Sequence, residues 1–128
     1  MNVHAYNMYR KTQVETASQL DLILMLYNGA IKYARWAREM IDQGRVEEAH
    51  NYLVRVQDIV DELNLGLNMD QGGQIASSLA QLYDYVNHCL IEANLRKVGE
   101  PIDEAIHILS QLKDTWAQLA GGSRGGEG

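Results

Sequence analysis

The chain has 128 residues, 46% of them apolar, and its 17 Asp and Glu residues outnumber its 11 Lys and Arg residues, which gives a formal net charge of −6. This length fits one domain with a single hydrophobic core, and the apolar content excludes a chain that stays disordered. The acidic balance argues against nucleic acid or an anionic membrane as the main partner.

Several further features predict a cytoplasmic protein. No run approaches the ~18 apolar residues of a membrane-spanning helix, and the first residues, MNVHAYNMYRKTQ, lack the apolar core of a signal peptide. The single Cys89 cannot form a disulfide within the chain and fits a reducing compartment.

Glycine and proline divide residues 18–120 into four segments of about 20–25 residues, with breaks at Gly44, at Gly72 and Gly73, and at Gly99 with Pro101. In each segment apolar residues recur every three or four positions, which is the period of a helix. The four stripes are Leu20, Ile23, Tyr27, Ala30, Ala34, Ala37 and Ile41; Val46, Ala49, Leu53, Val56, Val60, Leu63 and Leu67; Ile75, Leu79, Leu82, Val86, Cys89 and Ala93; and Ile102, Ala105, Leu109, Leu112, Trp116 and Leu119. Four stripes of similar length with short connections predict an all-α protein, an antiparallel four-helix bundle.

The two ends of the chain differ from this pattern. Ser18 is the expected N-cap of the first bundle helix, so residues 1–17 are predicted to be a short N-terminal helix or cap segment that docks on the bundle. Residues 121–128, GGSRGGEG, carry no apolar side chain and are predicted to be a disordered tail or linker outside the fold.

The first bundle helix carries more apolar side chains than one face requires. A second stripe of Leu22, Met25, Gly29, Trp36 and Met40 runs along it, with Tyr33 beside it. A helix on the outside of a bundle needs only one apolar face. Either the N-terminal segment covers the second stripe, or the bundle forms a dimer through it, or it is a groove for an amphipathic helix of a partner.

The residue pattern offers no catalytic centre. Two Glu-x-x-His pairs, Glu47 with His50 and Glu104 with His107, resemble half of a di-iron site. At about 100° per residue both pairs lie well away from the apolar stripe of their helix, so we expect surface residues, no metal and no cofactor. Cys89 has no activating neighbour in the sequence and is expected to be a core residue. The expectation is a protein that is not an enzyme.

Several ordered strings resemble the family of the flagellar secretion chaperone FliS. They are residues 6–9 (YNMY), 14–18 (VETAS), 22–30 (LILMLYNGA), 59–64 (IVDELN), 82–85 (LYDY), 91–94 (IEAN) and 114–116 (DTW). Each string alone is weak, and their order and spacing make the match specific. Many relatives place a proline just after the position of Ser18, where this chain has Gln19.

The resemblance implies a chaperone of the bacterial cytosol that binds the C-terminal segment of flagellin. Flagellin's terminal segments are disordered in the monomer, and covering one of them would prevent premature polymerisation and deliver flagellin to the flagellar type III export apparatus. The resemblance also implies that family members meet the export gate. We expect no nucleic acid and no membrane insertion, and a monomer or weak dimer.

The predicted flagellin-binding groove takes its walls from apolar residues of all the segments except the fourth. The candidates are Tyr6, Tyr9, Leu22, Met25, Leu26, Tyr27, Ile59, Leu63, Leu67, Tyr83 and Leu90. Core packing is the alternative for each of them, and for Leu26, Tyr27 and Leu63 it is at least as good an interpretation. The hypothesis places residues 1–17, with Tyr6 and Tyr9, in part of the groove until flagellin displaces them. The alternative function is a helical adaptor or dimerisation module for another client.

Overall fold

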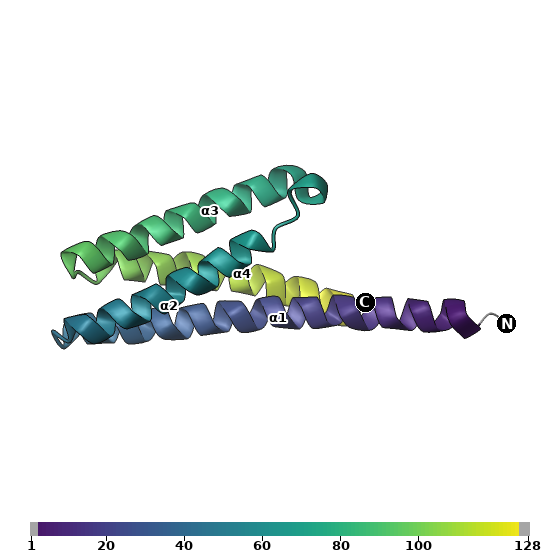
Figure 1. Ribbon diagram of the computed structural model, residues 1–128, viewed down its shortest axis with the longest axis horizontal. Coiled ribbons are helices and arrows are strands. Elements are labelled where there is room, and N and C mark those ends of the chain that lie inside the picture. Colours follow the sequence, from purple (N-terminus) through teal and green to yellow (C-terminus); the bar gives the residue numbers. More distant parts are fainter. Residues whose placement is uncertain (1–2, 126–128) are drawn as a thin grey trace.

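The computed structural model describes residues 3–125 and contains four helices, α1 Val3–Asp42, α2 Val46–Leu65, α3 Met69–Arg96 and α4 Glu100–Gly125. Within that range there is no strand. Each helix packs against two neighbours, α1 and α3 each against both α2 and α4, so that α1 and α3 lie diagonally across the bundle. Figure 1 shows the long rod of α1 with the other three helices gathered along one part of it. The predicted all-α bundle is confirmed.

The connections between the helices are short, which makes consecutive helices antiparallel. The α1–α2 turn uses Gly44 with a φ of +72°, a left-handed conformation that glycine adopts without steric cost. The amide of Arg45 then donates to the carbonyl of Met40 over 2.9 Å. The α3–α4 turn uses Lys97 in a similar conformation, with a φ of +54°.

The second connection has two parts. The helix α2 ends at Leu65 and α3 begins at Met69, and the helical geometry of α3 is interrupted again at Gly73, with φ +52° and ψ −125°. This kink lies at the predicted break, Gly72 and Gly73. The turn starts at Gly66, whose amide donates to the carbonyl of Glu62 over 3.1 Å. Gly66 therefore ends the second helix two residues before the last member of its apolar stripe, Leu67.

The helix ends also differ from the predictions. Ser18 does not start a helix, because α1 begins at Val3 and runs unbroken through 40 residues. In Figure 1 its first turns extend past the other helices instead of turning back onto them. Residues 3–17 contain no Gly or Pro, and a helix nucleated in the bundle gains one hydrogen bond for each residue that it adds. The last helix, α4, continues to Gly125, whereas the bundle was expected to end at 120.

Most of the core comes from the four predicted stripes, but Tyr83 and Leu90 are buried off the third stripe, whereas Ile75 and Leu82 of that stripe are exposed. The largest enclosed side chains of the core are Tyr27, Tyr83, Leu53, Leu90, Ile102 and Leu109, together with Val56, Val60 and Val86. No polar or charged residue is buried among the described side chains. In the part of the chain that the structure describes, no helix combines the length and apolarity needed to cross a bilayer.

Candidate functional site

An apolar pocket of about 360 Å³ opens at the end of the bundle where α2 gives way to α3. Its walls come from all four helices: Gln19, Leu22, Ile23 and Leu26 of α1, Glu62 and Leu63 of α2 with Gly66 and Leu67 beyond it, Tyr83 of α3, and Trp116 of α4. Seven of the ten lining residues have a large apolar or aromatic side chain, and two polar residues, Gln19 and Glu62, complete the lining. We call this the apolar pocket.

Leu22 of the pocket lining and several large apolar side chains close to the lining in the sequence remain in contact with solvent. Leu22 is 53% exposed, and Met25, one turn further along α1, is 68% exposed. Leu65 and Met69, on either side of the α2–α3 connection, are exposed as well. A pocket of this kind suits an apolar side chain of a partner segment, and the exposed Leu22 adds further apolar area.

Two tyrosine hydroxyls lie beneath the pocket. Tyr27 and Tyr83 are 0% and 1% exposed, and their hydroxyl oxygens are 2.5 Å apart. Burial raises the pKa of Tyr27 well above its ordinary value, and the hydrogen bond with Tyr83 raises it further, while a hydrogen bond from Trp116 acts in the opposite direction. Burial raises the pKa of Tyr83 as well. Both phenols therefore stay neutral, and their hydrogen bond joins the diagonal helices α1 and α3 under the pocket floor.

The structure brings five of the predicted groove residues together in this pocket: Leu22, Leu26, Leu63, Leu67 and Tyr83. Met25 is exposed and is not among the lining residues, and Ile59 is a partly buried side chain packed against the core. The positions Tyr6 and Tyr9 lie in α1, but their side chains fall outside those that the structure describes.

Two candidates belong to the core instead. Tyr27 and Leu90 are both fully enclosed, so neither offers a surface to a partner. Met40, expected in the uncovered second stripe, is only 9% exposed. Tyr27 lies on the predicted core stripe of its helix. Met40 and Leu90 lie off their stripes and are buried because each helix packs against two neighbours, so that its buried arc is wider than one stripe.

Ile23 and Trp116 line the pocket although the sequence pattern assigned them to core stripes. They stand where their stripes reach the open end of the bundle, and both are only partly buried. The periodicity gives no signal for this, since a stripe does not show where the neighbouring helix ends.

Trp36 lies away from the apolar pocket in a cluster of aromatic rings. Its ring centroid is 5.4 Å from that of Tyr52 and 5.6 Å from that of Tyr33. Lys32 places its ammonium over Tyr33 and Trp36, at 4.9 Å and 5.2 Å from the ring centroids. Aromatic and cation–π contacts of this kind stabilise an exposed surface. Trp36 nevertheless remains 41% exposed, and Met40 is the member of the second stripe that the bundle buries.

The residues considered for chemistry are placed as follows. The two Glu-x-x-His pairs are exposed at all four positions, Glu47, His50, Glu104 and His107. His50 shares a hydrogen bond of 2.7 Å with Asn94. Among the described side chains no three His, Cys, Asp or Glu residues lie close enough to hold a metal ion. Cys89 is buried, and this burial raises the pKa of its thiol, which makes it a poor nucleophile.

The fold and the pocket define a helical bundle with an apolar pocket at one end. The family model described as "Flagellar protein FliS" matches residues 2–123. The chain belongs to this FliS family, whose members named in the comparisons are flagellar secretion chaperones.

Three relatives are each named "Flagellar secretion chaperone FliS". The protein of Salmonella typhimurium is 36% identical over 86% of this chain and 82% of its own length. The protein of Bacillus subtilis is 32% identical over 88% of this chain and 84% of its own length. The protein of Vibrio cholerae is 31% identical over 84% of this chain and 79% of its own length. Because the match extends along nearly the whole bundle, the resemblance found in the short strings is confirmed.

Proposed function

We propose that this chain is a chaperone of the bacterial cytosol that binds the C-terminal segment of flagellin in the apolar pocket. Binding keeps that segment from polymerising early and delivers it to the flagellar type III export apparatus. Membership of a family of flagellar secretion chaperones supports a flagellar client, and the open apolar pocket with the exposed Leu22 in its lining is the observation that supports the mode of binding.

The size and chemistry of the pocket favour a helical segment that inserts one or two apolar side chains. Burying a Leu, Ile or Phe side chain contributes about 1.5–3 kcal/mol. Additional contacts with the exposed Leu22 offset the cost of ordering a client segment that is disordered when free. The contact is mainly apolar, so we expect a large negative heat-capacity change and little dependence on salt.

The client segment reaches this pocket without first displacing part of the chaperone's own backbone. Residues 3–17 continue α1 beyond the bundle, and the described lining of the pocket begins at Gln19. We therefore replace the earlier hypothesis, in which residues 1–17 lie in the groove until flagellin displaces them, by direct entry into an open pocket.

The test is calorimetric titration of the full chain with a synthetic peptide of the flagellin C-terminus. Leu22→Ser removes a pocket side chain that is already half exposed, so it should weaken binding about tenfold or more, which corresponds to ~1.4 kcal/mol, without changing the urea midpoint. Leu95→Ser is the matched control, because Leu95 is 81% exposed and lines no described pocket; its affinity should stay within about twofold of the unaltered chain. Absence of binding at micromolar concentrations, or equal losses in both variants, would reject the proposal.

A further inference from the structure

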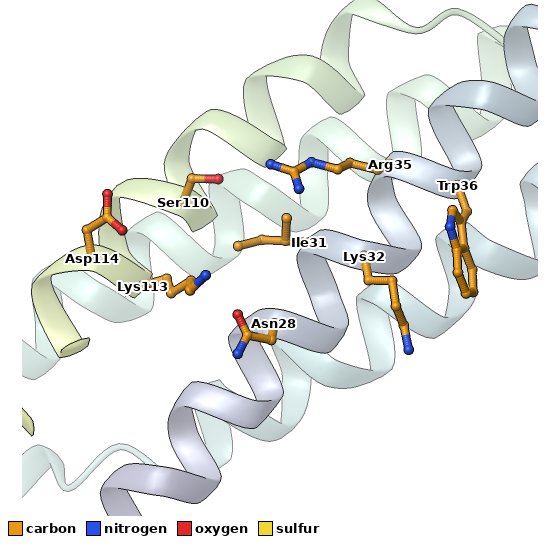
Figure 2. A pocket seen from close by; sticks show the side chains of 8 residues that line it. All are labelled: Asn28, Ile31, Lys32, Arg35, Trp36, Ser110, Lys113 and Asp114. Atoms are coloured by element: carbon orange, nitrogen blue, oxygen red, sulfur yellow. The ribbon is translucent and has the colours of Figure 1, made fainter.

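A second pocket, of about 460 Å³, lies between α1 and α4. Its lining is Asn28, Ile31, Lys32, Arg35, Trp36, Ser110, Lys113 and Asp114. Figure 2 shows Arg35 reaching from α1 towards Ser110 on α4, and Lys113 reaching from α4 towards Ile31. We call this the cationic cleft, because three basic side chains and a single carboxylate line it.

The charges of this cleft are unusual within the molecule. Three of the chain's 11 basic residues, Arg10, Lys11 and Arg124, lie outside the described side chains. Of the other eight, six have partners. Three form ion pairs: Arg38 with Asp42 and Asp103, Arg45 with Glu48, and Arg96 with Glu92. Lys97 forms a hydrogen bond with Asn94, and Arg55 and Lys32 lie over aromatic rings. Arg35 and Lys113 remain, and neither forms an ion pair or hydrogen bond with a described side chain.

These two cations line the same cleft in a protein whose net charge is −6. Acidic side chains are abundant on the rest of the surface, so an unpaired Arg and Lys at one place are not explained by a shortage of carboxylates. Asp114 stands at the rim but forms no ion pair with either of them. An Arg and a Lys on facing helices supply donors that a carboxylate from outside can accept.

The rest of the lining indicates what kind of anion fits. The buried Ile31 forms an apolar floor between the two cations, and Trp36, 41% exposed, stands at one end. A small inorganic anion would leave these apolar surfaces uncovered. A peptide with an acidic residue next to an apolar one would cover both kinds of surface, since Ser110 and Asn28 add polar groups at the edges.

We propose that the cationic cleft binds an acidic, partly apolar segment of a protein partner, with a partner carboxylate held between Arg35 and Lys113. The site is separate from the apolar pocket, and no residue lines both. Leu26 of the pocket and Arg35 of the cleft are nine residues apart on α1, which at about 100° per residue places them on opposite sides of that helix.

The experiment uses the full chain labelled with ¹⁵N and titrated with a synthetic helical peptide of Glu, Leu and Ala, with its Gln-for-Glu counterpart as the probe of charge. The amides of Ile31 and Ser110 should shift saturably with the Glu peptide and not with the Gln peptide. The double variant Arg35→Gln with Lys113→Gln should weaken binding at least tenfold. The double variant Arg45→Gln with Arg96→Gln removes the same charge from exposed ion pairs and should stay within about twofold of the unaltered chain.

A measurement of stability distinguishes a loss of peptide binding from a folding defect in the variant. Because Arg35 and Lys113 have no partner to lose, their double variant should unfold at the same urea concentration as the unaltered chain or a higher one. Three results would overturn the proposal: no saturable shift at millimolar peptide, equal weakening in the two double variants, or inorganic phosphate that shifts the same amides with equal or higher affinity. The last result would assign the cleft to a small anion.

Discussion

The buried hydroxyl pair of Tyr27 and Tyr83 joins two helices that otherwise lie diagonally across the bundle. Tyr83→Phe removes one hydroxyl and leaves that of Tyr27 buried without this partner. A hydrogen bond contributes about 0.5–1.5 kcal/mol net, and leaving a buried polar group unsatisfied costs about 1–3 kcal/mol. The hydrogen bond from Trp116 still serves Tyr27, so we expect a loss of about 1–2 kcal/mol in the free energy of unfolding.

The double variant Tyr27→Phe with Tyr83→Phe separates the hydrogen bond from the packing of the rings. With both hydroxyls removed, neither phenol is left unsatisfied, so the loss should be smaller than the sum of the two single losses by about 1 kcal/mol. Urea denaturation followed by far-ultraviolet circular dichroism measures all four chains. Tyr85→Phe is the control, because Tyr85 is 46% exposed on the same helix, and its loss should stay below about 0.5 kcal/mol. A loss below that value for Tyr83→Phe, or strict additivity of the two single variants, would refute the reasoning.

Three further predictions concern pH and backbone conformation. Burial raises the pKa of Tyr27 and Tyr83 in the folded state, so the unfolded chain loses these protons first as the pH rises. The stability of the fold should therefore fall above a pH of about 10. Urea midpoints measured against pH should fall less steeply in the double Phe variant. Gly44→Ala places a residue with a Cβ at a φ of +72° and should lower the stability by about 1 kcal/mol. Gly44→Asn should lower the stability less, because asparagine tolerates this conformation better. Equal losses in the two variants would show that the turn is not strained. Gly29→Ala should raise the thermal midpoint of unfolding, because alanine is more favourable than glycine in a helix interior by about 0.8–1 kcal/mol. The added Cβ would contact only Ile59 Cδ1, at 3.4 Å. A lower midpoint would show that this contact is too tight.

The helical period was sufficient to predict the bundle and most of its core. Leu53, Val56 and Val60 fall on one stripe of the sequence, and all three are fully enclosed. The period was less informative about the width of the buried face, because a stripe does not tell how many neighbours a helix has. Met40 and Leu90 lie off their stripes but face a second neighbouring helix, and they are buried for that reason.

The two pockets show a second limit of sequence analysis. Of the five predicted residues that line the apolar pocket, Leu22 and Leu26 belong to the helix whose apolar excess is visible in the sequence, and the other three come from later segments. The cationic cleft gave no such signal, since Arg35 and Lys113 stand on helices at opposite ends of the sequence. Within its own segment each basic residue is an ordinary polar position, and only the packing of α4 against α1 brings them to the same pocket.

Salt acts differently on the two sides of α1, and this follows from the charge distribution of the chain. An apolar client at the Leu26 side loses little when ions are added, because its binding rests on buried area. An acidic segment at the Arg35 side is attracted by nearby cations and repelled by the rest of a molecule with net charge −6. At about 0.1 M ionic strength the Debye length is ~10 Å, so the distant acidic residues are screened while the contact pair remains effective. At ~0.01 M the length grows to ~30 Å and the repulsion reaches the cleft. We therefore expect moderate salt to favour an acidic peptide at the proposed cationic cleft and to leave the proposed apolar client at the pocket nearly unaffected.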